Sequence, residues 1–599
     1  MSASVSDPAH HAALTLDGSS LTLEDLARVA RDPRVRVEIH PDAAVRIKAS
    51  RDQIEGLVAR YRKNREDGTP PVLEYGVTTG FGEFKNIAVA PKELRKLQSN
   101  ILLSHTVGAG ESADELHPAN YFDPEVVRAA LVIRLNAFLK GNSGIRPEMT
   151  EAVRAMINQG IIPLVPIRGS VGSSGDLSPL SHLFVTLLGD NRYFLVRTPE
   201  DLAFRPRELR GGLDHLKADL GMDVPEVSYK EGLALTNGAT FSAALLALAV
   251  HDAARTADAA DTACALSLEA VCGCARAFDP KIHEARGHAG QIASAENIRG
   301  LLKGSRLIER AGAVQDVYSL RCAPAVHGAA RDVIAYARTT AEREINAATD
   351  NPLFFPGGSD PWDLEFRANW PNGYRGDERA GYSAGNFHGE PVGISADALA
   401  IGLAELADIS ERRTQMLLDA HHNRNLPGNL IPHPGVNSGY MIAQYCAAGI
   451  VSENKVLTHP ASVDSIPTSA NSEDHNAMAT IAARKLRTVL RNAQAVLAIE
   501  LMVAAQAIEW RTLAVNSDPQ GVNTPREPFR AWEDAEAESG TFAAWVAAGN
   551  REPIAAWLGE GTRRAYQRIR EHIEPMLTDR TLDGDIRKVR AVVEKGRIA

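Results

Sequence analysis

Apolar residues recur at helical spacing along most of the chain from about residue 125 onward. This spacing predicts long helices over 123–141, 396–418 and 475–510, and the last range contains more than 30 residues without Gly or Pro. Long helices that are rich in alanine pack closely side by side. The pattern therefore predicts a mainly α protein, an elongated bundle of long helices with a smaller mixed region at the N-terminus.

The rest of the chain differs from these helical windows in composition and in the spacing of its apolar residues. Residues 1–70 predict short helices and one extended piece at 35–39, and a second strand-like run covers 192–197. Residues 354–383 are rich in Gly, Pro, Trp and charge and have no helical period, which predicts a surface loop inserted between helical blocks. We expect three regions: 1–225, 226–515 with the inserted loop, and a helical cap at 516–599.

Composition and charge exclude several classes of protein. The 599 residues include 75 acidic and 65 basic side chains, a net charge of −10, which argues against a nucleic-acid binder. The most apolar window, 233–252, is interrupted by Thr, Asn and Ser, so it predicts a buried helix and no membrane partner. The N-terminal residues lack the basic and apolar pattern of a secretory signal. Five cysteines are too few for a disulfide framework, so we expect a cytoplasmic protein.

The histidines give no metal-binding pattern along the sequence. The 18 histidines are scattered without the spacing of metal ligands. In 283–288, the fourth position after His283 is Gly287, which excludes the two-histidine helix of metalloproteases. We therefore expect no metal site.

The stretch "GSVGSSGDLSPLSH", residues 169–182, contains three Gly and five Ser among 14 residues. Asp176 or Ser178 as a helix cap explains its second half but not the Gly and Ser run before it. If the loop bends tightly, the unhindered nitrogen of Gly175 can attack the carbonyl carbon of Ser173. Loss of water closes a five-membered ring, and a second loss of water from Ser174 leaves an exocyclic methylene. The product is an electrophile made from the protein alone.

At these residues the sequence resembles the aromatic amino-acid ammonia-lyases, which include the histidine, phenylalanine and tyrosine enzymes. The resemblance extends from about residue 70 to 515 and rests on separate motifs that recur in order. These motifs lie at 75–82, 103–111, 169–182, 231–238, 314–322, 350–353, 385–392, 435–444, 452–455 and 462–475. The resemblance implies a prosthetic group, 4-methylidene-imidazol-5-one, formed from Ser173-Ser174-Gly175 without an external cofactor. The family usually has Ala at the position of Ser173. The side chain of this residue would be a substituent on the ring and would take no part in its closure.

The resemblance also implies roles for other residues. Tyr75 matches the catalytic tyrosine, which removes a β-proton as a phenolate, and nearby positive charge or hydrogen-bond donors would lower its pKa. Tyr318 matches a second tyrosine of the site. Arg321 would bind the substrate carboxylate through its planar fork of donors. The remaining matches are residues that support the electrophile or the bound amino acid: Asn237, Gln315 and Phe387. If their stretch is helical, Gln315 and Tyr318 share a face.

Two residues bear on the aromatic ring that the site accepts. His105 matches the histidine and tyrosine members, and Glu473 matches the histidine members, where the other enzymes usually carry an amide. A carboxylate at 473 can accept the N–H of an imidazole but suits an apolar ring poorly. His388 and Glu390, in "NFHGEP", also follow the histidine type. We therefore expect conversion of L-histidine to trans-urocanate.

Other interpretations stay open at this point. The segments 77–80 and 423–430 resemble the phenylalanine and tyrosine members. The alternatives are a tyrosine, phenylalanine or modified-histidine (betaine) lyase, an aminomutase that uses the same electrophile, or a non-catalytic homologue. The family builds its active sites from three subunits of a homotetramer, so the resemblance also implies a homotetramer.

Overall fold

The computed structural model describes residues 13–203, 209–357, 381–517, 540–546 and 551–598, together with residues 369 and 522. The chain forms two compact units, each built from three separate segments. The first unit comprises Met1–His251, Arg338–Ala396 and Pro460–Arg484. The second unit comprises Asp252–Ala337, Asp397–His459 and Lys485–Ala599. The three contiguous regions expected from the sequence stay a prediction.

Four long helices contribute residues to both units: α9 (Thr240–Ala270), α13 (Ala323–Glu344), α15 (Glu390–Leu418) and α17 (Ala479–Ser517). The helices predicted over 396–418 and 475–510 are confirmed as α15 and α17, and α15 begins six residues earlier than its pattern indicates. In the described part of the chain, α17 is the one helix that is long and apolar enough to cross a membrane. Of its apolar window, 83% is buried within the protein, as in the core helix of a soluble protein.

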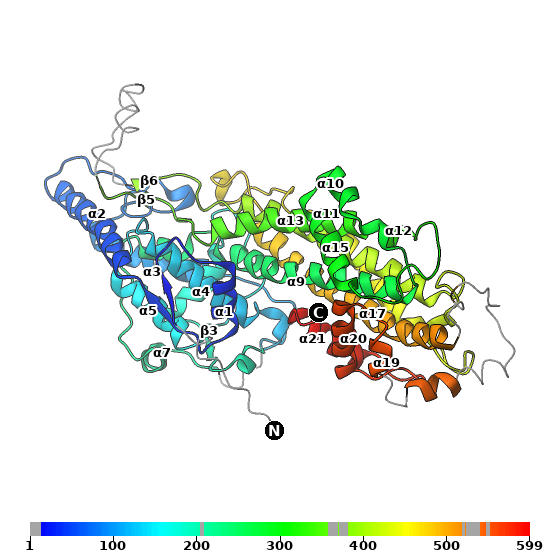
Figure 1. Ribbon diagram of the computed structural model, residues 1–599. Helices are drawn as coiled ribbons and strands as arrows, with labels where there is room; N and C mark the ends of the chain where they lie inside the picture. The colour runs from blue at the N-terminus through cyan, green and yellow to red at the C-terminus, as the bar shows by residue number, and fades with distance from the viewer. Residues whose placement is uncertain are drawn as a thin grey trace. The chain divides into compact units, whose positions relative to one another are not determined.

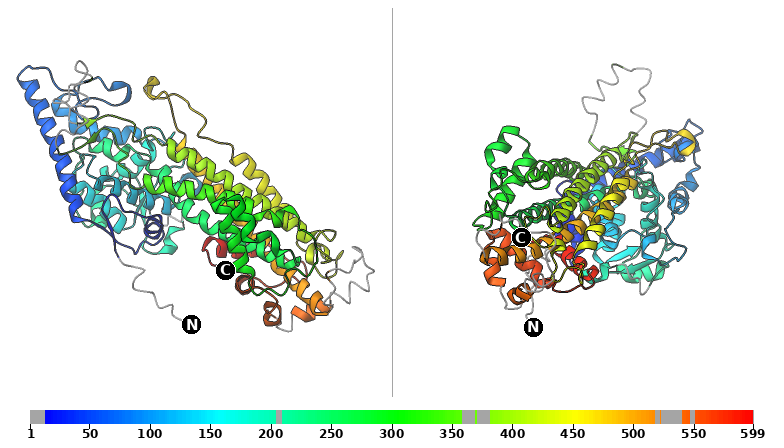
Figure 2. Two further views of the ribbon diagram at one scale, coloured as in Figure 1. Left: turned by 45° about the horizontal axis from the view of Figure 1, so that its top comes forward. Right: turned by 90° about the vertical axis from the view of Figure 1, so that its right-hand side faces the viewer.

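The first unit contains further helices besides its parts of these four. Its helices are α1 (Leu23–Arg31), α2 (Pro41–Glu66), α3 (Leu94–His105), α4 (Pro124–Leu139), α5 (Pro147–Asn158), α6 (Leu177–Phe184), α7 (Leu213–Leu220) and α8 (Glu231–Thr236). The helix predicted over 123–141 is confirmed as α4, whose residues are all buried except Glu125, and α1 lies beside it (Figure 1). The left view of Figure 2 shows α2 (blue) at the edge of this unit. Pro at the first position of α2, α4 and α5 presets the backbone for helix entry.

Strands are few and short in the described part of the first unit. Parallel β1 (Leu14–Leu16) and β2 (Val37–Ile39) pair Leu14 with Val37, and antiparallel β3 (Ile161–Pro163) and β4 (Tyr193–Leu195) pair Ile161 with Leu195. The strand-like runs predicted at 35–39 and 192–197 are confirmed as β2 and β4.

The inserted loop predicted at 354–383 lies largely outside the described residues. At its two ends, β5 (Leu353–Phe354) and β6 (Gly381–Tyr382) form an antiparallel pair. Much of the region from residue 518 to 550 also lies outside the described residues.

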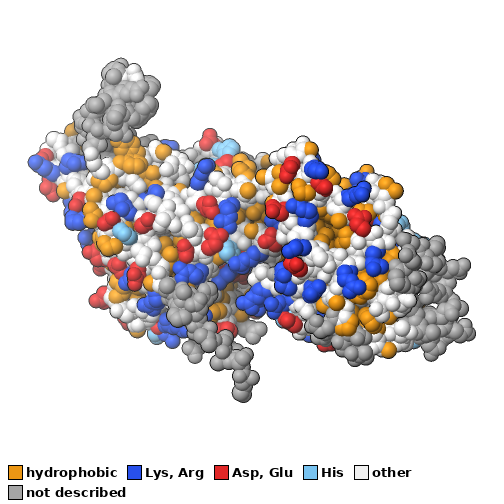
Figure 3. Space-filling view, in the orientation of Figure 1, with side chains coloured by type: hydrophobic (Ala, Val, Ile, Leu, Met, Phe, Trp, Pro, Cys, Tyr) orange, Lys and Arg blue, Asp and Glu red, His pale blue; other side chains and the backbone are white. Residues whose placement is uncertain are grey.

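The second unit contains further helices, some between the shared ones in the sequence and some after α17. They are α10 (Pro280–Arg286), α11 (Ala289–Leu302), α12 (Tyr318–Arg321), α16 (Met441–Leu457), α19 (Arg551–Ala555), α20 (Glu560–His572) and α21 (Asp583–Glu594). Helices α10 and α11 lie side by side (Figure 1). Short 3-10 turns complete both units. Acidic and basic side chains are interspersed over the face of the molecule seen in Figure 3.

Buried charges are paired in the core of the second unit. The guanidinium of Arg413 donates to both oxygens of Glu500, at 2.5 and 2.8 Å, and both side chains are fully buried. The hydroxyl of Ser267 donates to the same carboxylate at 2.7 Å. Because a lone buried charge is far more costly than a paired one, each partner depends on the other.

Replacing Glu500 with Gln is expected to lower the free energy of unfolding by about 3–5 kcal/mol, because it leaves the Arg413 charge buried and uncompensated. Urea unfolding of the full chain, followed by circular dichroism, measures the change. The matched control is Asp583→Asn, which removes the exposed partner of Arg587 and should change the free energy of unfolding by less than about 0.5 kcal/mol. Equal losses in the two variants would contradict the prediction.

Candidate active site

The Gly and Ser loop of the first unit is fixed by a close backbone contact. Gly175 has a φ of +71°, and a Cβ placed on it would lie 2.1 Å from the carbonyl carbon of Gly238. The N–H of Asp176 donates to the carbonyl oxygen of Gly238 at 2.8 Å, and residues 175 and 238 form a parallel bridge. Only glycine fits at 175, for both its backbone conformation and its space. The contact therefore leaves the nitrogen of residue 175 unhindered by a side chain.

Asp176 occupies the position before α6, yet its side chain makes no capping hydrogen bond. Its buried carboxylate accepts hydrogen bonds from the hydroxyls of Ser170 and Ser242, both at 2.9 Å, from the N–H of Ser242 at 2.8 Å, and from the hydroxyl of Thr480. Burial raises the pKa of Asp176 despite these donors. Asp176 thus ties the loop to the starts of α9 and α17.

A second carboxyl, that of the half-buried Glu344, lies in the electrostatic range of Asp176. Burial, with a smaller contribution from the charge of Asp176, raises the pKa of Glu344 to about 7. Its Oε1 atom is buried without a hydrogen-bond partner in the described part of the chain. A protonated Glu344 avoids placing two negative charges together in the core.

The residues of the triad contact two of the predicted site residues. The hydroxyl of Ser174 donates to Oε1 of Glu473 at 2.8 Å, and Nδ2 of Asn237 donates to the carbonyl oxygen of Ser174 at 2.8 Å. The hydroxyl of Thr468 donates to the other carboxylate oxygen of Glu473 at 2.8 Å. Glu473 therefore lies directly at the serine that the cyclisation would dehydrate, although 299 residues separate them.

Ser173, the residue that departs from the usual Ala, also makes a specific contact. Its buried Oγ accepts a hydrogen bond from the backbone N–H of Ala477 at 2.8 Å. Ala477 follows Glu473 in the same segment, so the extra hydroxyl attaches the triad to the loop that carries the carboxylate. The sequence could not reveal this partner, because the donor is a backbone N–H 304 residues away, which leaves no pattern in the residue types.

Tyr75 and His105 both lie in the electrostatic range of Glu473. The phenol oxygen of Tyr75 accepts a hydrogen bond from the N–H of Gly82 at 3.2 Å. Burial raises the pKa of Tyr75, and the charge of Glu473 raises it further. Together these two effects outweigh the hydrogen bond from Gly82, which lowers the pKa. The expected lowering of the Tyr75 pKa is therefore absent within this unit, chiefly because the phenol is buried and also because the nearby charge is negative.

Burial lowers the pKa of His105, which favours a neutral ring. The Nδ1 atom of His105 lies 2.9 Å from the hydroxyl oxygen of Ser104. A pocket of about 480 Å³ lies beside this histidine, with Arg168, Gly169 and Ser178 among its lining residues. His105 thus stands at a cavity that begins at the Gly and Ser loop.

Phe387 is half-buried in the first unit. Two residues later, the N–H of Gly389 donates to the carbonyl oxygen of Gly172 at 3.0 Å. A Cβ on Gly389 would lie 2.5 Å from that oxygen. This contact brings the 385–392 segment onto the loop that holds the triad.

Gln315, Tyr318 and Arg321 belong to the second unit. The side chain of Tyr318 is 71% exposed, and the guanidinium of Arg321 lies 4.6 Å from the centre of its ring. Arg321 also donates to the carbonyl oxygen of Asp316 at 3.0 Å. Because α12 begins only at Tyr318, Gln315 precedes the helix, and the expected shared helical face does not form.

The structure also assembles a cluster that the sequence interpretation missed. Ligand atoms of His388, Glu390 and His475 all lie within 4.8 Å of one another. The expectation of no metal site stays a prediction, because these residues lack ligand spacing along the sequence although their ligand atoms lie close together in space. His388 and Glu390 belong to the motif at 385–392, and His475 belongs to the motif at 462–475. Both motifs contact the triad loop, and this common location is the feature that could have revealed the cluster.

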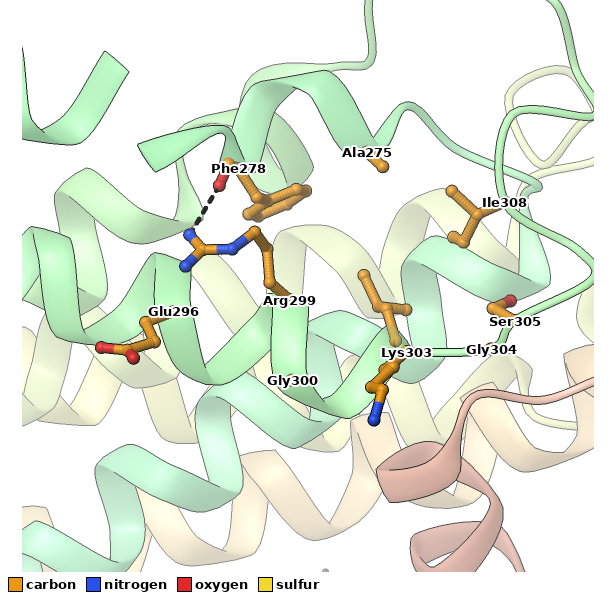
Figure 4. A pocket seen from close by; sticks show the side chains of 10 residues that line it. Ala275, Phe278, Glu296, Arg299, Gly300, Lys303, Gly304, Ser305 and Ile308 are labelled. Carbon is orange, nitrogen blue, oxygen red and sulfur yellow. Dashed lines mark hydrogen bonds between the residues drawn. The ribbon is translucent and has the colours of Figure 1, made fainter. Parts of the chain in front are cut away.

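Another pocket of about 530 Å³ lies in the second unit, and Figure 4 shows its lining side chains. Arg299 spans part of it and donates to the carbonyl oxygen of Phe278 at 3.0 Å. The predicted site residues do not line this pocket.

Comparison with known proteins identifies the family. The family model for aromatic amino acid lyases matches residues 21–527. The chain belongs to the aromatic amino acid lyase family. It is therefore a carbon–nitrogen lyase.

Members of the aromatic amino acid lyase family resemble the chain over nearly its full length. A histidine ammonia-lyase from Caldanaerobacter subterraneus is 40% identical over 98% of this chain and 97% of its own length. The crystal structure of histidine ammonia-lyase from Trypanosoma cruzi matches with a TM-score of 0.76 and 33% identity, over 98% of this chain and 94% of the other. A tyrosine aminomutase from Streptomyces globisporus matches with a TM-score of 0.78 and 30% identity, over 98% and 97% of the two chains.

Replacing Ser173 with Ala is expected to lower the free energy of unfolding by about 1–3 kcal/mol, because the buried N–H of Ala477 loses its acceptor. Urea unfolding of both proteins measures the difference. Ser472→Ala serves as the control, since Ser472 is an exposed serine of the same segment. An unchanged stability of the Ser173 variant would show that the hydroxyl is not needed as an acceptor.

Proposed function

We propose that this protein removes ammonia from L-histidine to give trans-urocanate. The single observation that carries the proposal is the position of Glu473, whose carboxylate reaches Ser174 of the triad and acts electrostatically on Tyr75 and His105. A carboxylate there can accept the N–H of an imidazole ring, whereas a phenyl ring offers it no donor. The similarity to histidine ammonia-lyases over nearly the full chain supports the same substrate.

We propose that Ser173-Ser174-Gly175 forms 4-methylidene-imidazol-5-one without an external cofactor. The nitrogen of Gly175 bonds to the carbonyl carbon of Ser173, and that oxygen leaves as water with the amide hydrogens of Gly175 and Ser174. The hydroxyl of Ser174 leaves with its Cα hydrogen as a second water, which creates the methylene.

The surroundings of the triad fit such a group. The contact between Gly175 and Gly238 excludes a side chain from the attacking residue. Asn237 already donates to the oxygen of Ser174, which would become the carbonyl oxygen of the ring. Negative charge that develops on this oxygen would be stabilised by the same donor.

The prosthetic group supplies an electrophile that binds the substrate amine and makes it a better leaving group. Tyr75 would remove the β-proton. Because burial and Glu473 raise the pKa of Tyr75, this role needs an added positive charge. We assign that charge, and the binding of the substrate carboxylate, to Arg321, with Gln315 and Tyr318 beside the substrate and Phe387 beside the prosthetic group.

We propose that copies of the chain assemble as a homotetramer, so that one site draws residues from several copies. The exposed Tyr318 fits a residue that acts in a neighbouring copy. Helix α16 supports the assembly, because Ile442, Tyr445 and Val456 are 62%, 64% and 74% exposed. Apolar side chains in such number on one helix favour burial against another chain.

We place the enzyme in the cytoplasm, with a small aromatic amino acid as its partner and no nucleic acid or membrane. The cysteines support this location, because the five of them are free. The net charge of −10 opposes binding to nucleic acid phosphates.

The similarity to a tyrosine aminomutase favours a second candidate function. In that case, the ammonia would return to the β-carbon, and the substrate would be tyrosine or phenylalanine. A third candidate function is the elimination of the amine from a modified histidine with a betaine group.

The peptide that contains residues 173–175 is expected to be lighter by two water molecules than its sequence requires. Mass spectrometry of the denatured and digested protein measures this loss. Ser174→Ala keeps the backbone but has no hydroxyl to eliminate, so its peptide should lack the second loss. An unmodified peptide in the wild-type protein would contradict the self-formed prosthetic group.

Histidine is expected to react faster than tyrosine or phenylalanine, as measured by ammonia release and by the ultraviolet absorbance of a conjugated acid. Glu473→Gln should reduce kcat/KM for histidine by roughly 10- to 100-fold, since a hydrogen bond to a charged group contributes about 1.5–3 kcal/mol. Phenylalanine turnover should fall less. Asp474→Asn is the control, because Asp474 is an exposed neighbour.

The products separate the candidate functions. Faster turnover of tyrosine or phenylalanine, or a β-amino acid as the main product, would overturn the assignment to histidine elimination.

A further inference from the structure

Two segments that contact the triad loop meet at a cluster of potential metal ligands. His388 and Glu390 lie at the start of α15, and His475 lies just before α17. One ligand atom of each residue lies within 4.8 Å of the others. Two imidazoles and one carboxylate form a typical donor set for zinc and related first-row metals.

The ring of His388 is oriented in the manner of a metal ligand. Its Nε2 atom lies 3.3 Å from the carbonyl oxygen of His475, which fits a hydrogen on Nε2. The Nδ1 atom then carries the lone pair, and it lies 4.0 Å from Oε2 of Glu390. The N–H of Glu390 approaches this Nδ1 at 3.4 Å, a long hydrogen bond that a metal can replace. Metal-binding histidines usually donate their other ring N–H to a carbonyl or carboxylate oxygen.

The carboxylate of Glu390 supplies an independent observation. Its Oε2 atom is buried and has no hydrogen-bond partner in the described part of the chain. Buried carboxylate oxygens almost always have a donor or a cation. The atom without a partner is the same one that faces Nδ1 of His388.

We propose that His388, Glu390 and His475 bind one divalent first-row transition metal ion, with zinc as the reference ion. The exposed side chain of His475 can rotate to close the site. Zinc ligands lie about 2.0–2.2 Å from the metal, so binding draws the three donor atoms closer than they lie now. The fourth position stays open to water.

The metal would act as a positioning element and not as a reagent. The N–H of Gly389, which lies between the ligands His388 and Glu390, donates a hydrogen bond to the carbonyl oxygen of Gly172. The N–H of Ala477, two residues after the third ligand, donates a hydrogen bond to the hydroxyl of Ser173. An ion that joins the two ligand segments therefore fixes both sides of the triad loop. This proposal does not depend on the identity of the amino acid substrate.

The test measures zinc binding by the full-length protein without any amino acid present. Isothermal titration with zinc chloride, after removal of metals by chelator and dialysis, is expected to give one site per chain and to raise the thermal unfolding midpoint. Glu390→Gln and His475→Gln should each weaken zinc binding by at least about 10-fold, as the loss of a ligand does. Circular dichroism verifies that both variants are folded.

Two control variants separate this site from other zinc binding. His288→Ala removes an exposed histidine of the second unit, and Cys446→Ser removes an exposed thiol, so both should bind zinc as the wild type does. Cobalt(II) in place of zinc should give a visible spectrum without thiolate charge-transfer bands. Wild-type zinc affinity in both ligand variants, or a thiolate spectrum that disappears in Cys446→Ser, would overturn the proposal.

Discussion

The arrangement of the first unit depends on one backbone contact, that of Gly175 with Gly238. No side chain fits between these residues, and the hydrogen bond from Asp176 to Gly238 holds them in register. The carboxylate of Asp176 then binds the starts of α9 and α17, so the tight loop and the long helices fix one another. These donors offset part of the desolvation of Asp176, which helps the core to tolerate a buried acid beside the triad.

Glu473 introduces two opposed electrostatic effects. Its negative charge is suited to an imidazole N–H and holds the hydroxyl of Ser174. The same charge raises the pKa of Tyr75 and thereby opposes the formation of a phenolate. A site that selects a polar ring with a carboxylate must therefore receive positive charge from elsewhere, through arginine or through the bound substrate. In the proposed mechanism, selectivity for the ring and strength of the base are coupled through Glu473.

Patterns within single segments of the sequence predicted many of the helices. Such patterns cannot predict contacts between residues that are distant in the sequence. The helical spacing in 123–141, 396–418 and 475–510 predicted α4, α15 and α17, because each helix carries its own periodicity. The motifs indicated the family, which the family model confirms, whereas the roles of the site residues stay predictions. The partner of Ser173, the clustering of His388 with His475, and the role of Asp176 depend on tertiary contacts. Asp176 illustrates the reason: a local rule makes it a helix cap, but distant donors bind its carboxylate instead.

The backbone setting of Gly175 has a consequence for the lifetime of the enzyme. A dissociable cofactor can be exchanged after chemical damage, and the protein that held it can be used again. The proposed reagent, built from residues 173–175, would belong to the covalent chain, and Gly175 lies against Gly238, where no other residue fits. A nucleophile that blocked this reagent irreversibly would inactivate that copy of the site for good. The cell would then recover the activity only by degrading the chain and synthesising another.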